Sequence, residues 1–152
     1  MRIPYDRLAS DGLKALGGVY AYVSKCGLEK SLVDLIYLRA SLINGCAYCV
    51  DAHSHDLLQA GVPMQKVLVL QAWREARHLF TEREQAALSL TDAITRIAEA
   101  GVPDAIFESA RAKFSEEELA NLTIAVGLIN ANNRIAITFH REPDFRPVAN
   151  AA

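Results

Sequence analysis

The chain is organised around ten residues, Asn44-Gly45-Cys46-Ala47-Tyr48-Cys49-Val50-Asp51-Ala52-His53. Asparagine followed by glycine is typical of a helix end, so a new helix is predicted to begin near Cys46. Both cysteines would then lie in its first turn, where free backbone N–H groups and the positive end of the helix dipole favour an anion. A thiolate is such an anion, and the pKa of a thiol falls in that setting. The stretch therefore predicts a reactive dithiol at the start of a helix.

His53 follows Cys49 by four residues, so the two side chains share one face of this helix. A histidine there can take the proton of Cys49, directly or through a water molecule. The histidine in turn needs a partner that fixes its tautomer, and Asp34 is one candidate. Helices over residues 29–43 and 46–60 pack antiparallel across the turn between them, which puts Asp34 and His53 at similar depth. On the sequence alone, a plain helix charge at Asp34 remains an equal alternative.

The composition is that of a folded globular chain. The 152 residues are 51% hydrophobic and 22% charged, which suits a single domain over residues 1–152. A net charge of −2 gives no general attraction to nucleic acid or to acidic membranes. Apolar runs are too short to span a bilayer, and residues 1–6 lack the apolar core of a signal peptide. We therefore expect a cytoplasmic protein, where a C-x-x-C pair is more often catalytic or metal-binding than a structural staple.

Helical periodicity dominates the chain and predicts an all-α fold of about seven helices. Two capping boxes mark helix starts, one at Thr81 with Glu84 and one at Ser115 with Glu118. The final helix is apolar on more than one side, as expected for a central helix or a subunit contact. A loosely held tail is predicted from Pro143. The expected helices span approximately residues 10–25, 29–43, 46–60, 63–73, 81–100, 103–110 and 115–142.

Other roles for the two cysteines are open on the residues alone. A structural zinc could use Cys46, Cys49, His53 and a fourth ligand, but the usual second pair of cysteines is missing. The remaining cysteine, Cys26, lies far upstream and is interpreted as a small buried or partly buried hydrophobe. Covalent haem attachment needs a histidine directly after the second cysteine, where Val50 stands. Two buried cysteines without chemistry remain a further alternative.

The central stretch resembles the carboxymuconolactone decarboxylase superfamily, and specifically its alkylhydroperoxidase D (AhpD)-like branch. The shared feature is a C-x-x-C pair with a histidine four residues after the second cysteine. The similarity covers most of the chain between about residues 30 and 140. Beyond residues 44–53 it extends over residues 35–41, 73–75, 80–88 and 129–134.

The resemblance implies roles for four residues. Cys49 would be the attacking thiol and Cys46 the resolving thiol, with His53 and Asp34 as their proton relay. The family usually has glutamate in place of Asp34, and often tryptophan in place of Asn132. It also implies an all-helical fold that assembles into trimers or hexamers. Because decarboxylase members lack the dithiol, lactone decarboxylation is not expected.

The order of attack stays open on the residues alone. In many C-x-x-C helices the first cysteine is the more exposed and the better nucleophile, which favours Cys46. The histidine at i+4 favours Cys49 instead. We predict that Cys49 attacks the peroxide and that Cys46 closes the disulfide on it.

We therefore expect a thiol-dependent alkyl hydroperoxidase, an oxidoreductase that holds no cofactor and no metal. Its partners would be a hydroperoxide substrate and a dithiol reductant, such as a lipoylated protein or a thioredoxin-like donor. One alternative is a disulfide reductase that recycles a separate peroxiredoxin. Two others are a redox sensor without turnover and a zinc-stabilised structural oligomer. No nucleic-acid or membrane partner is expected.

Overall fold

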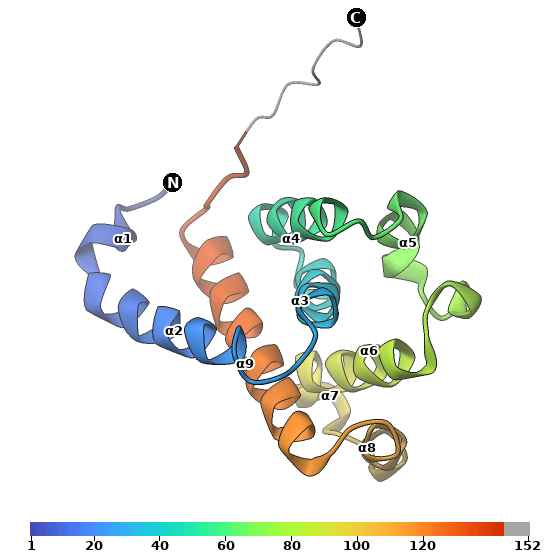
Figure 1. Ribbon diagram of the computed structural model, residues 1–152. Helices are drawn as coiled ribbons and strands as arrows, with labels where there is room; N and C mark the ends of the chain where they lie inside the picture. The colour runs from blue at the N-terminus through green and yellow to red at the C-terminus, as the bar shows by residue number, and fades with distance from the viewer. Residues whose placement is uncertain (145–152) are drawn as a thin grey trace, which may run out of the picture.

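The computed structural model describes residues 1–144, and every regular element within them is helical (Figure 1). The predicted all-α fold is confirmed, and the two helices beyond the seven expected, α1 and α7, have four residues each. Most of the predicted tail, residues 145–152, lies outside the described residues. The α-helices are α1 (Tyr5–Leu8), α2 (Ser10–Val23), α3 (Lys30–Asn44), α4 (Ala47–Gln59), α5 (Met64–Val69), α6 (Glu82–Thr95), α7 (Ile97–Ala100), α8 (Asp104–Arg111) and α9 (Glu116–Thr138), and the 3₁₀ turns are η1 (Leu70–Ala72) and η2 (Arg77–Leu79).

Helix α3 is the buried centre of the fold. Every residue from Leu32 to Ser41 is buried, so α3 is covered on all sides. It packs against α4, α6 and α9, which lie around it in Figure 1. Gly45 ends α3 in the left-handed conformation, with φ of 71°, and its N–H donates to the carbonyl of Ser41. The chain therefore turns back directly after Asn44, and α4 follows α3 along its length.

Helix α9 is a second long helix of the fold. It runs diagonally across Figure 1 and contacts α2, α3, α6 and α8. Its inner residues are buried, while Ile124 and Ile137 are exposed. The prediction of a final helix that is apolar on more than one side is thus confirmed. The helix ends at Thr138 rather than at the predicted residue 142. The reason is that His140 adopts a positive φ of 52°, which closes the helix.

Both predicted capping boxes are confirmed, and they start α6 and α9. Two further helices are shorter than predicted. The helix expected over residues 81–100 is interrupted at Arg96, where α6 ends and α7 begins. In the segment 63–73, the α-helix stops at Val69 and tightens into η1, where the carbonyl of Gln71 accepts a hydrogen bond from Arg39. No helix in the described part of the chain is long and apolar enough to cross a membrane.

A buried ion pair joins α3 to α6. Arg39 Nε donates to Asp92 Oδ1 at 2.6 Å, and both side chains are less than a tenth exposed. Asp92 Oδ2 also accepts from the Arg74 guanidinium at 3.0 Å and from the Trp73 indole N–H at 3.4 Å. Arg39 donates a further pair of hydrogen bonds to the carbonyl and side-chain oxygens of Gln71. Both buried charges are therefore satisfied, and they tie the η1 segment to the centre of the fold.

Asp92→Ala is expected to lower the free energy of unfolding by about 3–5 kcal/mol, because Arg39 would stay buried without its counter-charge. Urea unfolding followed by circular dichroism measures the loss. Asp11→Ala is the matched control, since Asp11 pairs with Lys14 in open solvent and its removal should cost less than about 1 kcal/mol. Equal losses in the two variants would contradict this role for Asp92.

Candidate functional site

The two cysteines lie at the first turn of α4. Cys46 is the N-cap residue, and its Sγ accepts a hydrogen bond from the backbone N–H of Cys49 at 3.3 Å. The structure joins them in a disulfide with Cα atoms 5.4 Å apart, and this pair is called the dithiol below. Both residues are buried, at 1% and 4% exposure. In the reduced protein, the N–H donor and the helix dipole favour a thiolate at Cys46, as predicted for a cysteine at a helix start.

Cys49, in contrast, lines a cavity of about 280 Å³, and Cys46 is not among the residues that line it. Helix α4 contributes Cys49 and His53 to the cavity wall, and α9 contributes Ile129 and Asn132. The thiol that a small substrate can reach from this cavity is that of Cys49.

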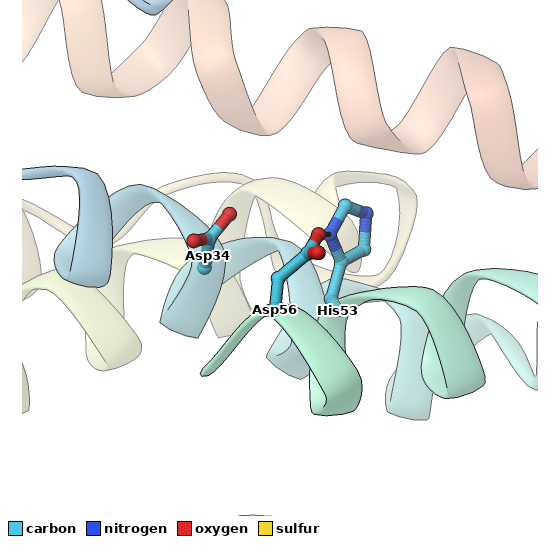
Figure 2. Close-up of side chains that lie close together, drawn as sticks. All are labelled: Asp34, His53 and Asp56. Atoms are coloured by element: carbon cyan, nitrogen blue, oxygen red, sulfur yellow. Dashed lines mark ion pairs between the residues drawn. The ribbon is translucent and has the colours of Figure 1, made fainter. Parts of the chain in front are cut away.

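His53 lies between this cavity and two carboxylates. Asp34 faces it from α3, and Asp56 lies beside it on α4 (Figure 2). A ring nitrogen of His53 and one carboxylate oxygen from each aspartate lie within 4.8 Å of one another. Asp34 is buried and forms an ion pair with Lys30 at the start of α3. The α3–α4 hairpin thus brings Asp34 to His53 at the depth that the spacing from the turn predicts.

Asp56 is a residue that the sequence reasoning missed. Its Oδ2 lies 3.6 Å from His53 Nδ1, which is too long for a hydrogen bond but close enough for an ion pair once the ring is protonated. The signal in the sequence is the i, i+3 spacing from His53, which puts both side chains on one helix face. His53 therefore has a buried carboxylate on one helix and a half-exposed one on its own.

The histidine ring is held in its neutral form. Burial lowers the pKa of His53, while the carboxylates of Asp34 and Asp56 act in the opposite direction. Its Nδ1 is buried and has no hydrogen-bond partner within residues 1–144. Tyr37 packs against the ring, with centroids 5.1 Å apart, and helps to shield it from solvent. A neutral imidazole next to a thiol is the form that can accept a proton.

Asp34, His53 and Asp56 also offer the oxygen and nitrogen donors that divalent cations bind. Among the described side chains, they are the one group of three histidine, cysteine or acidic residues close enough to share an ion. The group contains neither cysteine of the dithiol. The geometry therefore gives no support to the zinc alternative that the sequence left open, which was built on Cys46 and Cys49.

Comparison with known proteins gives a consistent result. The model of the carboxymuconolactone decarboxylase family matches residues 11–93, more than half of the chain. The uncharacterised protein YdfG of Bacillus subtilis is 33% identical over 136 residues, which cover 90% of this chain and 92% of YdfG. Alkyl hydroperoxide reductase AhpD of Mycobacterium marinum is 39% identical over 46 residues, which cover 30% of this chain and 26% of that reductase.

One solved structure is similar over nearly the whole length. It is a protein of unknown function from Agrobacterium tumefaciens, for which a role as an antioxidant defence protein AhpD has been suggested. It is 43% identical to this chain and superposes with a TM-score of 0.92, covering 95% of this chain and 99% of its own. These two relatives, which match over nearly the whole chain, are uncharacterised or of unknown function, and the match to the Mycobacterium marinum reductase is confined to a short segment.

Proposed function

Since this chain belongs to the carboxymuconolactone decarboxylase family, in its AhpD-like branch, we propose that it reduces organic hydroperoxides with its dithiol. The observation that carries the proposal is the cavity that Cys49 shares with His53. A cysteine able to form a disulfide and a neutral, partly buried histidine border the same space of about 280 Å³. Thiol-based reduction of a peroxide needs this combination of nucleophile, base and room for a small substrate.

In the proposed cycle, His53 accepts the proton of Cys49, and the thiolate attacks the terminal oxygen of the hydroperoxide. The O–O bond breaks, Cys49 becomes a sulfenic acid, and the alkoxide takes a proton from His53 and leaves as the alcohol. The Cys46 thiol then gives up its proton and attacks Cys49 Sγ, the disulfide forms, and the hydroxide that leaves takes up that proton as water. An external dithiol supplies two electrons and two protons by thiol–disulfide exchange, and is itself oxidised to a disulfide.

Burial of both cysteines supports a small peroxide as the oxidant. A hydroperoxide fits a cavity of about 280 Å³, whereas a folded peroxiredoxin cannot enter it with its disulfide. This favours the peroxidase over a reductase that recycles a separate peroxiredoxin. The reductant has to reach the same sulfur, so we propose a small dithiol or one on a flexible arm, such as the lipoyl group of a lipoylated protein.

In the proposed mechanism, the two aspartates stabilise the protonated form of His53. The ring gains a positive charge when it takes the thiol proton, and burial alone disfavours that charge. Negative charge on Asp34 and Asp56 offsets this cost. Asp34 is the buried carboxylate but shares its charge with Lys30, while Asp56 is nearer to Nδ1 but more exposed. Neither aspartate lines the cavity of Cys49, so both act through His53 as positioning residues.

The double variant Asp34→Asn, Asp56→Asn is expected to slow the oxidation of Cys49 by roughly tenfold or more, the effect of losing about one pKa unit of stabilisation of the histidinium. Each single variant should lose less than the double. Stopped-flow oxidation at several pH values measures the effect, because a shifted pH profile separates an electrostatic role from a structural one. Asp104→Asn, on the distant helix α8, is the matched control and should leave rate and profile unchanged. An unaltered double variant would remove both aspartates from the relay.

The oligomeric state and the cellular location of the protein are part of the same proposal. We propose a single domain over residues 1–152 that acts in the cytoplasm as a homo-oligomer, a trimer or a hexamer. Exposed apolar side chains on α1 and α2, namely Leu8, Tyr20 and Tyr22, support a subunit contact there. Light scattering coupled to size-exclusion chromatography measures the mass in solution, and a monomer would rule out the oligomer.

The peroxidase itself is tested on the reduced, metal-free protein. Mixing with an organic hydroperoxide and quenching with acid, followed by intact-mass measurement, should show rapid loss of two hydrogens as the disulfide forms. Turnover with a dithiol reductant then separates an enzyme from a sensor that is oxidised once. Slow oxidation by peroxide but fast oxidation by an oxidised peroxiredoxin would favour the reductase instead.

A further inference from the structure

A positive charge, on the exposed side chain of Arg141, lies at the cavity of Cys49. Arg141 lines this cavity together with Cys49 and His53. Its guanidinium carbon stands 3.9 Å from the centroid of the Tyr48 ring, and its Nη1 donates to the Tyr5 hydroxyl at 3.4 Å. Within residues 1–144 it forms no ion pair with a carboxylate. The face of the guanidinium is therefore held by an aromatic ring, while N–H groups at its edge remain available to a ligand.

The backbone at Arg141 is fixed as well. Helix α9 closes in a Schellman motif, in which the N–H of Arg141 donates to the carbonyl of Ala136 at 2.9 Å and that of His140 to Ile137 at 3.2 Å. His140 supplies the left-handed residue of the motif, a position that glycine usually takes. A non-glycine residue held there carries some strain, so the turn that presents Arg141 is well determined.

The N-terminal segment braces the same helix end. The backbone N–H of Arg2 donates to the carbonyl of Phe139 at 2.8 Å, and its guanidinium donates to Thr138 at 3.0 Å. Tyr5 stacks on Phe139 with ring centroids 4.8 Å apart, which aims its hydroxyl at Arg141. Residues near both ends of the described chain therefore hold Arg141 at the cavity.

A second cavity, lined mainly by apolar residues, lies next to the cavity of Cys49. This second cavity, of about 310 Å³, shares Tyr5, Leu13 and Ile135 with the cavity of Cys49. Its further walls come from apolar residues of α1 and α2 and from Phe139, and it contains no charged side chain. A molecule at Cys49 therefore meets a cation on one side and a hydrocarbon-like surface on another.

We propose that Arg141, with Tyr5, selects hydroperoxides that carry a carboxylate on an apolar chain. The carboxylate accepts charge-assisted hydrogen bonds from Arg141, the peroxide group lies at Cys49, and the remaining chain lies along Leu13 and Ile135. The redox step at Cys49 is the one already described, so no further reactant is needed. This inference rests on the proposed peroxidase and names the class of substrate that the same site takes.

The test compares linoleic acid hydroperoxide with its methyl ester, both below the concentration at which they form micelles. Single-turnover disulfide formation in the native protein should be about tenfold faster with the acid than with the ester, as expected for one charge-assisted contact. Arg141→Gln should bring the ratio of the two rates to about one, and Arg141→Lys should restore part of it. The matched control Arg134→Gln, whose guanidinium bonds within α9, should keep the native ratio. Equal rates with acid and ester in the native protein would overturn the proposal.

A binding measurement makes the inference independent of turnover. Titration calorimetry of the disulfide form with linoleate and with methyl linoleate should show a preference for the acid that Arg141→Gln removes. If neither hydroperoxide oxidises Cys49, the proposed peroxidase fails, and this binding preference alone decides the role of Arg141. Loss of binding to both ligands alike in Arg141→Gln, or no preference in the native protein, would reject carboxylate selection.

Discussion

Cys49→Ser is expected to lower hydroperoxide reduction by at least about 10³-fold, since removing the nucleophile of an enzyme commonly costs more than this. The reason is specific to the site. Cys49 is the cysteine that lines the cavity, and it shares that cavity with His53. A serine hydroxyl in its place is not deprotonated at neutral pH and cannot be oxidised to a sulfenic acid. Stopped-flow mixing with an organic hydroperoxide, followed by intact-mass measurement, gives the rate and the product.

Cys46→Ser provides the decisive comparison, because the two cysteines differ in role and share one turn of helix. Cys49 should still be oxidised once in that variant, and its sulfenic acid should persist long enough to be trapped with a dimedone-type reagent. Cys26→Ser, which removes the free cysteine, should behave like the native protein. Cys46 is the alternative nucleophile. Its Sγ accepts a hydrogen bond from the N–H of Cys49, and it lies closer to the positive end of the helix dipole. If Cys49→Ser still forms a sulfenic acid and Cys46→Ser does not, the two roles are reversed.

His53→Gln is expected to slow the first oxidation by about 10²–10⁴-fold, the usual contribution of a positioned general base. Glutamine keeps a polar side chain of similar size but cannot take a proton at neutral pH. Alkylation of the reduced protein with iodoacetamide at a series of pH values reports the thiolate directly. Its midpoint should move to higher pH in the variant, because the thiol loses the group that accepts its proton.

The pH dependence of the native enzyme follows from the same residue. Burial lowers the pKa of His53, so the ring stays neutral as the pH falls through the range where an ordinary histidine, near 6.5, becomes protonated. The acid limb of the rate profile should therefore lie below pH 6.5, and His53→Gln should remove it. His55→Gln is the matched control, since His55 lies on the same helix and is exposed. An unchanged alkylation profile in His53→Gln would exclude the histidine as the base.

Much of the fold could be predicted because its signals are local. The capping boxes at Thr81 and Ser115 and the helix stop at Gly45 are each recognised from a few neighbouring residues. Once a helix stops at Gly45 and another starts at Cys46, the hairpin geometry alone brings Asp34 to His53. These features depend on spacings along the sequence, and a regular helix converts such spacings into known relative positions of the residues.

The remaining features depend on contacts between distant segments. Arg39 and Asp92 are 53 positions apart, and no local pattern distinguishes a buried charge of this kind from a solvated one. Asp56 shows the correct spacing to His53, but an acidic residue at i+3 is common on exposed helix faces. Arg141 could not be placed, because the turn before it uses the left-handed His140 and lacks the glycine that normally marks such a turn.

The order in which the chain is synthesised decides when the walls around Cys49 are complete. Tyr5 and Arg141, which meet at the cavity, are 136 positions apart, and Arg2 holds the end of α9 from the same N-terminal side. On the ribosome, α3 and α4 emerge and can pair well before α9 has been synthesised. Until α9 docks, the nascent chain carries two thiols without the part of the cavity wall that α9 contributes and without Arg141 beside them. The selection among oxidants that we propose for Arg141 would thus be acquired last, and a chain stalled before α9 would lack it.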